Sequence, residues 1–157
     1  MVWIKRFLIL ALIALVVIQF IPVEKNEGGY ESLDTFIAET KPSEEAQAIL
    51  MSSCYDCHSN QTDYPWYSKI APVNFWLADH IKDGKRHLNF SDWSNYNDKR
   101  KDHKLEEAIE AFEEGWMPLE SYTFIHKDAD LTEEQREFMA TWAKAARLRY
   151  SGAAQPQ

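Results

Sequence analysis

The stretch Cys54-Tyr55-Asp56-Cys57-His58 is the most informative part of this 157-residue chain. Two cysteines three positions apart at the end of a helix can each bond one vinyl-derived carbon on the same edge of a haem. A histidine directly after the second cysteine can then reach the iron from one side. The stretch therefore predicts one covalently attached haem c, held by Cys54 and Cys57, with His58 as the proximal iron ligand. We expect the rest of the domain to fold around this group.

Three other roles compete for the cysteine pair. A disulfide between cysteines this close would close almost no loop and would stabilise little. A thioredoxin-like redox pair needs a βαβ context, and the sequence indicates none. A zinc site needs four ligands at workable spacing, and the chain has no second cysteine pair. We therefore favour haem attachment over these three readings.

Met117 is the residue that we expect to supply the second iron ligand. It follows Gly115-Trp116, where a helix should end, and Pro118 restricts its backbone to an extended conformation. This takes the side chain out of helix packing, and a thioether opposite a histidine raises the reduction potential of a haem. A methionine can also fill a gap in a core, and His80 and His126 are the alternative distal ligands.

Aromatic residues are dense in the domain, and Trp66 and Tyr67 follow closely after the cysteine pair. Their ordinary role is core packing. Around a haem, the same rings would line an apolar pocket that keeps water from the iron. We therefore predict that Trp66 and Tyr67 are cofactor-binding residues. A backbone carbonyl near Pro65 or Pro72 is expected to accept the Nδ1 proton of His58.

The first 23 residues have the order of an export signal, with Lys5-Arg6 followed by an almost unbroken apolar run at 7–23. At about 1.5 Å per residue this run makes about 25 Å of helix, near the lower limit for spanning a bilayer. Its end lacks the small residues of a cleavage site. We therefore expect residues 1–23 to form an uncleaved transmembrane signal anchor, with the two bases in the cytoplasm.

The rest of the chain is expected to contain a linker at 24–42, a haem-binding domain at 43–150 and a disordered tail at 151–157. The linker is polar, although a short helical turn at 33–37 should pack on the domain. The tail has no apolar anchor. Because no run alternates between apolar and polar residues, the predicted fold class is all-α.

The helices of the domain are marked by apolar residues at helical spacing and by capping residues. The stretches 59–74 and 89–98 are expected to be loops. The expected helices run from Ser43 as N-cap to Cys54; over 75–82, ended by Asp83-Gly84; over an apolar stripe at 105–112, ended by Gly115; and from a capping box at 132–135 to about residue 150.

Residues 24–157 hold all 25 acidic residues and 15 of the 17 basic ones, which gives them a formal net charge of −10. Such a surface repels phosphates and argues against a nucleic-acid partner. It would suit a basic partner, although an acidic surface also simply aids solubility. The identity of any redox partner protein is not indicated.

The block from Cys54 to Tyr67 resembles the family called the haem-binding domain. The resemblance covers about residues 43–148, and its further matching parts are Asn89–Trp93, Gly115–Leu119, Tyr122, His126 and Leu131. It implies a cytochrome c-like helical domain around one haem, in which Met117 takes the place of the Met-Pro ligand of cytochrome c. It also implies a small membrane-anchored or exported bacterial protein, so we expect one crossing of the inner membrane and a haem domain in the periplasm.

The leading hypothesis for function is one-electron transfer by a monohaem c-type cytochrome, which is a carrier rather than an enzyme. An iron bound by both His58 and Met117 has no open position for a substrate. The alternative is a haem enzyme or sensor for peroxide or a gas, with an open or labile distal site and His126 as distal acid or base. A third reading is a haem module that mainly docks a partner enzyme.

Overall fold

The computed structural model describes residues 1–151, and every regular element in this range is helical, which confirms the all-α prediction. Glu27 and Gln61 form an isolated bridge outside any strand. The predicted tail at 151–157 lies outside the described residues except for Ser151. The elements are α1 (Val2–Val17), η1 (Ile18–Phe20), η2 (Glu31–Leu33), α2 (Asp34–Thr40), α3 (Glu44–Ser53), α4 (Tyr55–His58), η3 (Trp66–Lys69), α5 (Val73–His87), η4 (Phe90–Asn95), α6 (Asp98–Glu114), α7 (Glu120–Thr123), η5 (Lys127–Ala129) and α8 (Glu133–Ser151), where η denotes a short 3₁₀ helix.

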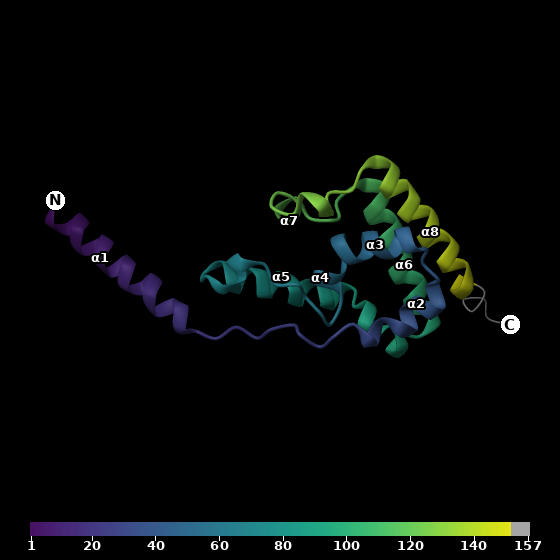
Figure 1. The fold of residues 1–157 in the computed structure, drawn as a ribbon, viewed down its shortest axis with the longest axis horizontal. Coiled ribbons are helices and arrows are strands. Elements are labelled where there is room, and N and C mark those ends of the chain that lie inside the picture. The colour runs from purple at the N-terminus through teal and green to yellow at the C-terminus, as the bar shows by residue number, and fades with distance from the viewer. Residues whose placement is uncertain (152–157) are drawn as a thin grey trace.

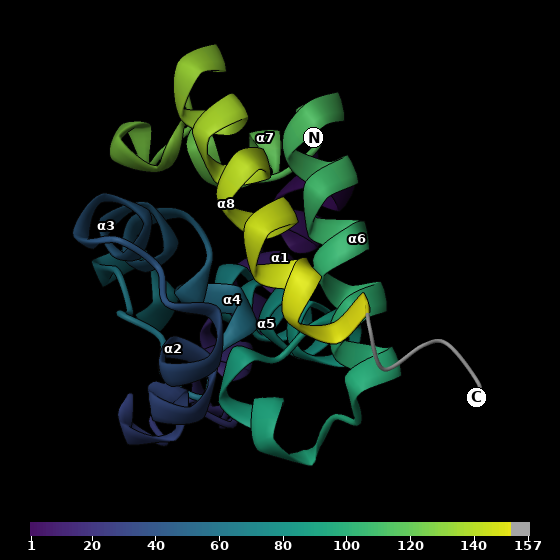
Figure 2. The same ribbon diagram turned by 90° about the vertical axis from the view of Figure 1, so that its right-hand side faces the viewer.

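Helices α6 and α8 pack side by side in opposite directions and form one wall of the domain (Figure 2). Gly115 ends α6 in the left-handed conformation, with φ of 68°, which a glycine adopts without steric cost. Thr132 and Gln135 form the capping box of α8. The Thr132 N–H donates to Gln135 Oε1 at 3.0 Å, and the Gln135 N–H donates to Thr132 Oγ1 at 3.2 Å. The predicted ends of both helices are confirmed.

The core lies between this helix pair and the short elements α2, α3 and η4. Phe36 of α2 and Trp93 of η4 are fully buried, and their rings meet edge to face with centroids 5.1 Å apart. Leu50 of α3 and Leu105 of α6 are buried beside them. The helical turn predicted at 33–37 is therefore confirmed as part of the packed domain. The predicted boundary between the linker and the domain, at residues 42 and 43, stays a prediction.

A carboxylate is enclosed at the edge of this core. Glu39 Oε2 accepts hydrogen bonds from Lys101 Nζ at 2.8 Å, from Tyr150 Oη at 2.7 Å and from Trp93 Nε1 at 3.2 Å. The Lys101 side chain is only 8% exposed, and a buried charge is tolerated when it is paired and hydrogen-bonded. The cluster joins α2, η4, α6 and α8.

Helix α5 is longer than the sequence predicts. The prediction that Asp83-Gly84 ends a helix at 75–82 is wrong, because α5 continues through both residues to His87. Gly84 is instead a contact position: a Cβ there would lie 2.7 Å from the carbonyl oxygen of Cys57. The missing side chain lets α5 approach α4 closely. The two predicted loops also contain short helices, η3 and η4.

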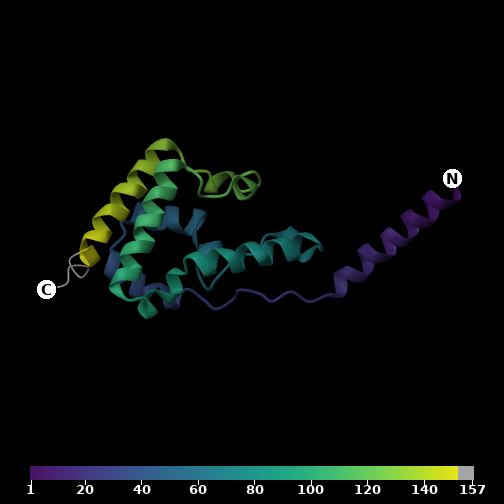
Figure 3. The same cartoon turned by 180° about the vertical axis from the view of Figure 1, so that it is seen from behind.

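Helix α1 stands away from the domain, and the chain that follows it passes along α5 (Figures 1 and 3). The helical stretch Val2–Phe20 has a mean hydropathy of 2.2 and is long and apolar enough to cross a membrane. Gln19 bonds both backbone groups of Ala71, accepting its N–H at 3.0 Å and donating to its carbonyl at 3.1 Å. Further along, Lys85 Nζ of α5 donates to Asn26 Oδ1 at 2.7 Å.

Candidate functional site

The Cys54–His58 stretch comprises the break after α3, at Cys54, and the whole of α4. Ser43 caps α3 as predicted, because its Oγ accepts the N–H of Ala46 at 3.2 Å. At the other end of α3 the chain turns at Cys54 and makes the single turn of α4. The Cys54 carbonyl accepts the N–H groups of both Cys57 (3.2 Å) and His58 (2.9 Å). One helical turn therefore carries both thiols and the imidazole.

Both cysteines are free thiols and are half-buried. Burial, with the neighbouring Cys57 as a smaller cause, raises the pKa of Cys54 to about 12. Burial and the nearby Asp56 charge raise the pKa of Cys57 to about 11. Thiol–disulfide exchange needs a thiolate, so this environment disfavours the thiol redox reading. Within residues 1–151, no group of three or more His, Cys, Asp or Glu side chains is placed to hold a metal ion.

The ring of His58 is oriented by the backbone of Leu88, whose carbonyl oxygen lies 2.9 Å from Nδ1. A carbonyl only accepts hydrogen bonds, so Nδ1 carries the proton and Nε2 keeps its lone pair. This is the tautomer in which a histidine binds a metal through Nε2. Burial also lowers the pKa of His58, which favours the neutral ring.

The prediction that a carbonyl near Pro65 or Pro72 orients His58 is therefore wrong. Leu88 directly follows α5, and it reaches His58 because α5 continues past Gly84 and lies close against Cys57. A backbone carbonyl has no side-chain signature, so the sequence could not indicate which residue provides it. Both thiols are free, and the Leu88 carbonyl holds the His58 ring with Nε2 available to a metal. These two features fit an attached haem.

Met117 is half-buried in the connection between α6 and α7, outside any helix, and its peptide bond to Pro118 is cis. The connection returns towards the cysteine turn, because the Tyr122 hydroxyl of α7 donates to Asp56 Oδ2 at 2.7 Å. Asp56 and Tyr122 are site residues that the sequence did not single out for this contact. They are 66 positions apart, so spacing gives no signal for the pair.

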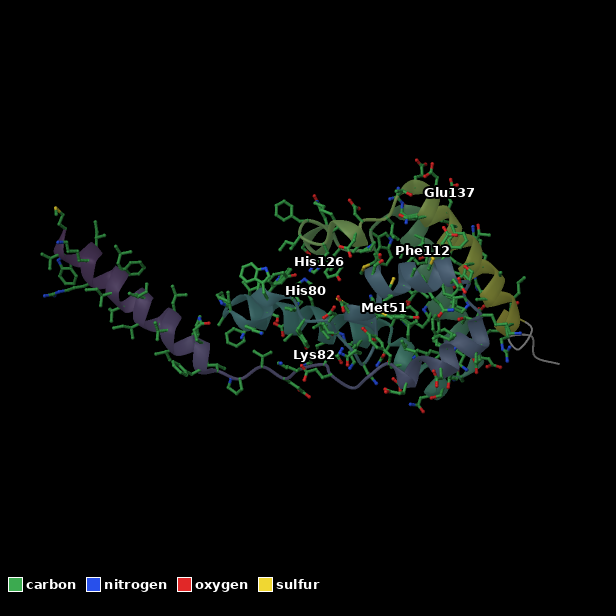
Figure 4. The ribbon with its side chains drawn as sticks, in the orientation of Figure 1. Met51, His80, Lys82, Phe112, His126 and Glu137 are labelled. Atoms are coloured by element: carbon green, nitrogen blue, oxygen red, sulfur yellow. The ribbon has the colours of Figure 1, made fainter. Side chains whose placement is uncertain are left out.

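The two alternative distal histidines are both engaged. His126 Nε2 is hydrogen-bonded to the Tyr67 hydroxyl at 2.6 Å, and His80 Nδ1 lies 2.9 Å from the carbonyl oxygen of Trp76. Figure 4 shows His126 after α7 and His80 on α5. The predicted cofactor-binding pair differs in exposure, since Trp66 is 76% exposed while Tyr67 is half-buried against His126.

These features define a class of protein: an all-helical domain in which one turn presents two free thiols and a histidine with an available Nε2. The family model of the haem-binding domain matches residues 13–145, so the chain belongs to the haem-binding domain family. The predicted family is confirmed, and membership supports haem binding. No curated protein and no solved structure matches the chain.

Proposed function

We propose that this chain is a membrane-anchored monohaem c-type cytochrome that transfers single electrons on the outer side of the bacterial inner membrane. The observation that carries the proposal is the bond from His58 Nδ1 to Leu88, beside the two free thiols, in a chain of a haem-binding family. A bound haem supplies the one-electron Fe(III)/Fe(II) couple. The residues of the chain hold it, orient it and limit access to it.

Cys54 and Cys57 would hold the haem by thioether bonds. In this attachment each S–H would add across one vinyl group, with sulfur bonding one vinyl carbon and the thiol hydrogen going to the other. The addition needs no oxidant, only thiols that are kept reduced. The high pKa values of both thiols are consistent with thiols that await this addition rather than taking part in disulfide exchange.

His58 and Met117 would be the residues that bind the iron, and Trp66 and Tyr67 would contact the haem. The available Nε2 of His58 supports the first assignment. Met117 is supported by its position outside any helix, on a connection tied back to the cysteine turn. With both residues bound, the iron would have no site left for a substrate, which favours a carrier over an enzyme. A thioether ligand also favours a raised reduction potential.

The anchor would be α1, which crosses the membrane once and leaves the haem domain in the periplasm. Its length and composition support this role, and Lys5-Arg6 favour a cytoplasmic N-terminus. The acidic surface of residues 24–157 would suit a basic redox partner, while nucleic acid would be repelled.

A haem enzyme or sensor is the second candidate, and one contact favours it. His126 and Tyr67 form a hydrogen-bonded pair of 2.6 Å close to α7, and such a pair could act as a distal acid or base if Met117 binds weakly or leaves the iron.

The test is to express the full chain with haem-attachment machinery and to purify it in detergent. We expect a mass increase of one haem that survives denaturation, a sulfur–iron charge-transfer band in the oxidised protein and slow carbon monoxide binding in the reduced one. Met117→Ala should abolish the band and speed carbon monoxide binding. Met51→Ala, at a methionine of α3 that is 47% exposed, is the matched control and should change neither.

Any other result would favour a different cofactor state or a different iron ligand. A colourless protein with two titratable thiols would overturn the haem proposal. Prompt carbon monoxide binding by the unaltered protein, without the charge-transfer band, would favour the enzyme or sensor. An unchanged band in Met117→Ala would assign the sulfur ligand to another methionine, and an unaltered protein that resists carbon monoxide but lacks the band would favour a histidine.

A further inference from the structure

The segment that carries Met117 is weakly packed. We call residues 116–130, which connect α6 to α8 and include α7 and η5, the Met117 segment. It projects from the α6–α8 end of the domain (Figures 1 and 3). Its large apolar side chains are mostly open to solvent, with Trp116 52%, Phe124 74% and Ile125 58% exposed. Such a segment needs specific contacts if one of its residues is to keep a fixed position.

Ala129 of η5 is fully buried, and η5 packs on α3. This contact fixes the end of the segment near α8. It lies twelve positions after Met117, beyond α7. Within α7 the one buried residue is Thr123, so the part around Met117 depends on further contacts.

The α7 end of the segment is fastened by Tyr122. Its hydroxyl donates to Asp56 Oδ2 at 2.7 Å, while Asp56 Oδ1 accepts the backbone N–H of Asp63 at 2.8 Å. The carboxylate is thus held by donors on both oxygens. A hydrogen bond to a charged acceptor is stronger than one between neutral groups. Burial and then this bond raise the pKa of Tyr122, so its hydroxyl keeps the proton that it donates.

The position of Asp56 gives this contact its importance. Asp56 lies between the two cysteines and two residues before His58, on the turn of α4 itself. The bond therefore joins the segment bearing the proposed distal ligand directly to the turn bearing the proximal one. The position of α7 relative to α4 is therefore set by a direct contact and not through a third helix.

The aromatic ring of Tyr122 makes a second connection. It stacks on His126 with centroids 4.3 Å apart and an interplanar angle of 13°, and His126 Nε2 bonds the Tyr67 hydroxyl of η3 at 2.6 Å. The hydroxyl of Tyr122 thus reaches α4, and its ring connects to η3 through His126. Tyr122 is the residue common to both connections.

We propose that Tyr122 is a positioning residue, whose hydrogen bond to Asp56 fixes the Met117 segment over the Cys54–His58 turn and so keeps the thioether within reach of the iron. This inference rests on the proposed function, because it takes Met117 as the distal ligand. Without the bond, the segment opens more often, and the distal side of the iron becomes accessible to small ligands.

The test compares two tyrosine-to-phenylalanine variants of the full haem-loaded chain. Tyr122→Phe removes the hydroxyl that bonds Asp56 but keeps the ring on His126. Tyr64→Phe is the matched control, because its hydroxyl accepts the Asn26 N–H, also at 2.7 Å, which is a bond outside the Met117 segment. We expect Tyr122→Phe to bind carbon monoxide about tenfold faster or more, and to weaken the sulfur–iron band. Tyr64→Phe should do neither.

Hydrogen exchange of the peptides covering 116–126 provides a readout that needs no haem. We expect faster exchange in Tyr122→Phe than in the unaltered chain or in Tyr64→Phe. Asp56→Asn should reproduce part of the effect. Adding Asp56→Asn to Tyr122→Phe should change little further, because both substitutions remove the same interaction.

The outcomes separate this inference from the function on which it rests. Unchanged exchange in Tyr122→Phe would overturn the claim that this bond holds the segment. Faster exchange with unchanged carbon monoxide binding would show a structural contact only. If the unaltered protein lacks covalent haem or the sulfur–iron band, the proposed function or its Met117 ligand fails, and the exchange comparison still decides whether Tyr122 holds the segment.

Discussion

His58 has a free Nε2 because a backbone carbonyl decides which ring nitrogen carries the proton. The Leu88 oxygen at 2.9 Å holds the proton on Nδ1, and a ring without such an acceptor would exchange between tautomers and rotate. The acceptor belongs to the main chain, so no substitution of Leu88 removes it. Its position depends instead on where α5 ends and how closely α5 approaches α4.

Glu39 shows how a single residue stabilises the domain around the site. Burial alone would raise the pKa of Glu39, but hydrogen bonds from Lys101, Tyr150 and Trp93 outweigh burial and lower it from the ordinary value of 4.5. The folded protein therefore binds the Glu39 proton less readily than the unfolded chain does. The resulting stabilisation is present above about pH 4.5 and is lost as the pH falls through the lower, folded value.

We predict that Glu39→Gln lowers the free energy of unfolding by about 2 kcal/mol at pH 7, because the variant loses charged hydrogen bonds and leaves Lys101 buried without its partner. The loss should shrink as the pH falls below about 4.5 towards the lower, folded pKa of Glu39, because the unfolded chain of the unaltered protein takes up the Glu39 proton first and this favours unfolding. Urea unfolding at a series of pH values measures both effects. Glu137→Gln, at an exposed residue of α8, is the control. Equal losses at pH 7 and pH 3.5 would contradict this role of the Glu39 charge.

The sequence predicts the site residues that stand together in a short motif. It does not predict contacts between residues that are far apart in the chain. Cys54, Cys57 and His58 stand in one pentapeptide, so their shared position on one turn follows from helix geometry. The Tyr122–Asp56 bond depends on a chain reversal after α6 that brings together residues 66 positions apart. Local periodicity carries no information about such a contact.

At the scale of the elements, the close packing of α5 on α4 is the feature that determines the site. Gly84 permits it, because a side chain there would meet Cys57. In a helix interior, replacing glycine by alanine normally stabilises by about 1 kcal/mol, since alanine has the higher helix propensity. At Gly84 the sign should reverse, because a Cβ only 2.7 Å from the Cys57 carbonyl oxygen forces the helices apart.

We predict that Gly84→Ala destabilises the domain by about 1–3 kcal/mol and lowers the fraction of chains that carry haem, because it displaces the Leu88 carbonyl from His58. Denaturant unfolding and the ratio of haem absorbance to protein measure the two effects. Lys82→Ala, at an exposed position on the same helix, should leave both unchanged (Figure 4). A gain in stability for Gly84→Ala, with full haem content, would show that α5 tolerates the side chain.

The element boundaries were predictable where capping chemistry is unambiguous. Ser43, Gly115 and the Thr132–Gln135 box each satisfy backbone groups at a helix end, and all three do so in the structure. Gly84 misled the prediction because a glycine after a polar residue has two physical meanings, a helix end or a close contact. Only the neighbouring element distinguishes them, and α4 lies 27 positions earlier in the chain.

At the scale of the whole molecule, the apolar N-terminus and the haem-binding domain behave as parts of one unit. The family match begins at residue 13, within α1, and continues to residue 145. The bonds from Gln19 to Ala71 connect the end of the apolar helix to the loop before α5, and Asn26 bonds Lys85. If α1 stays attached, these contacts set how far the domain lies from the membrane surface.

We therefore predict that the mature protein retains α1 and carries one haem, so that peptides of α1 are found in the purified protein and its mass includes one haem. The protein should remain in membranes washed at high salt and high pH, because a spanning apolar helix is held by the hydrophobic effect rather than by charge.

Protease added to cells with a permeabilised outer membrane should digest the domain, since Lys5-Arg6 favour a cytoplasmic N-terminus. A mass that lacks about the first 20 residues, with the protein in the soluble fraction, would replace the anchor by a cleaved export signal and leave the haem site unaffected.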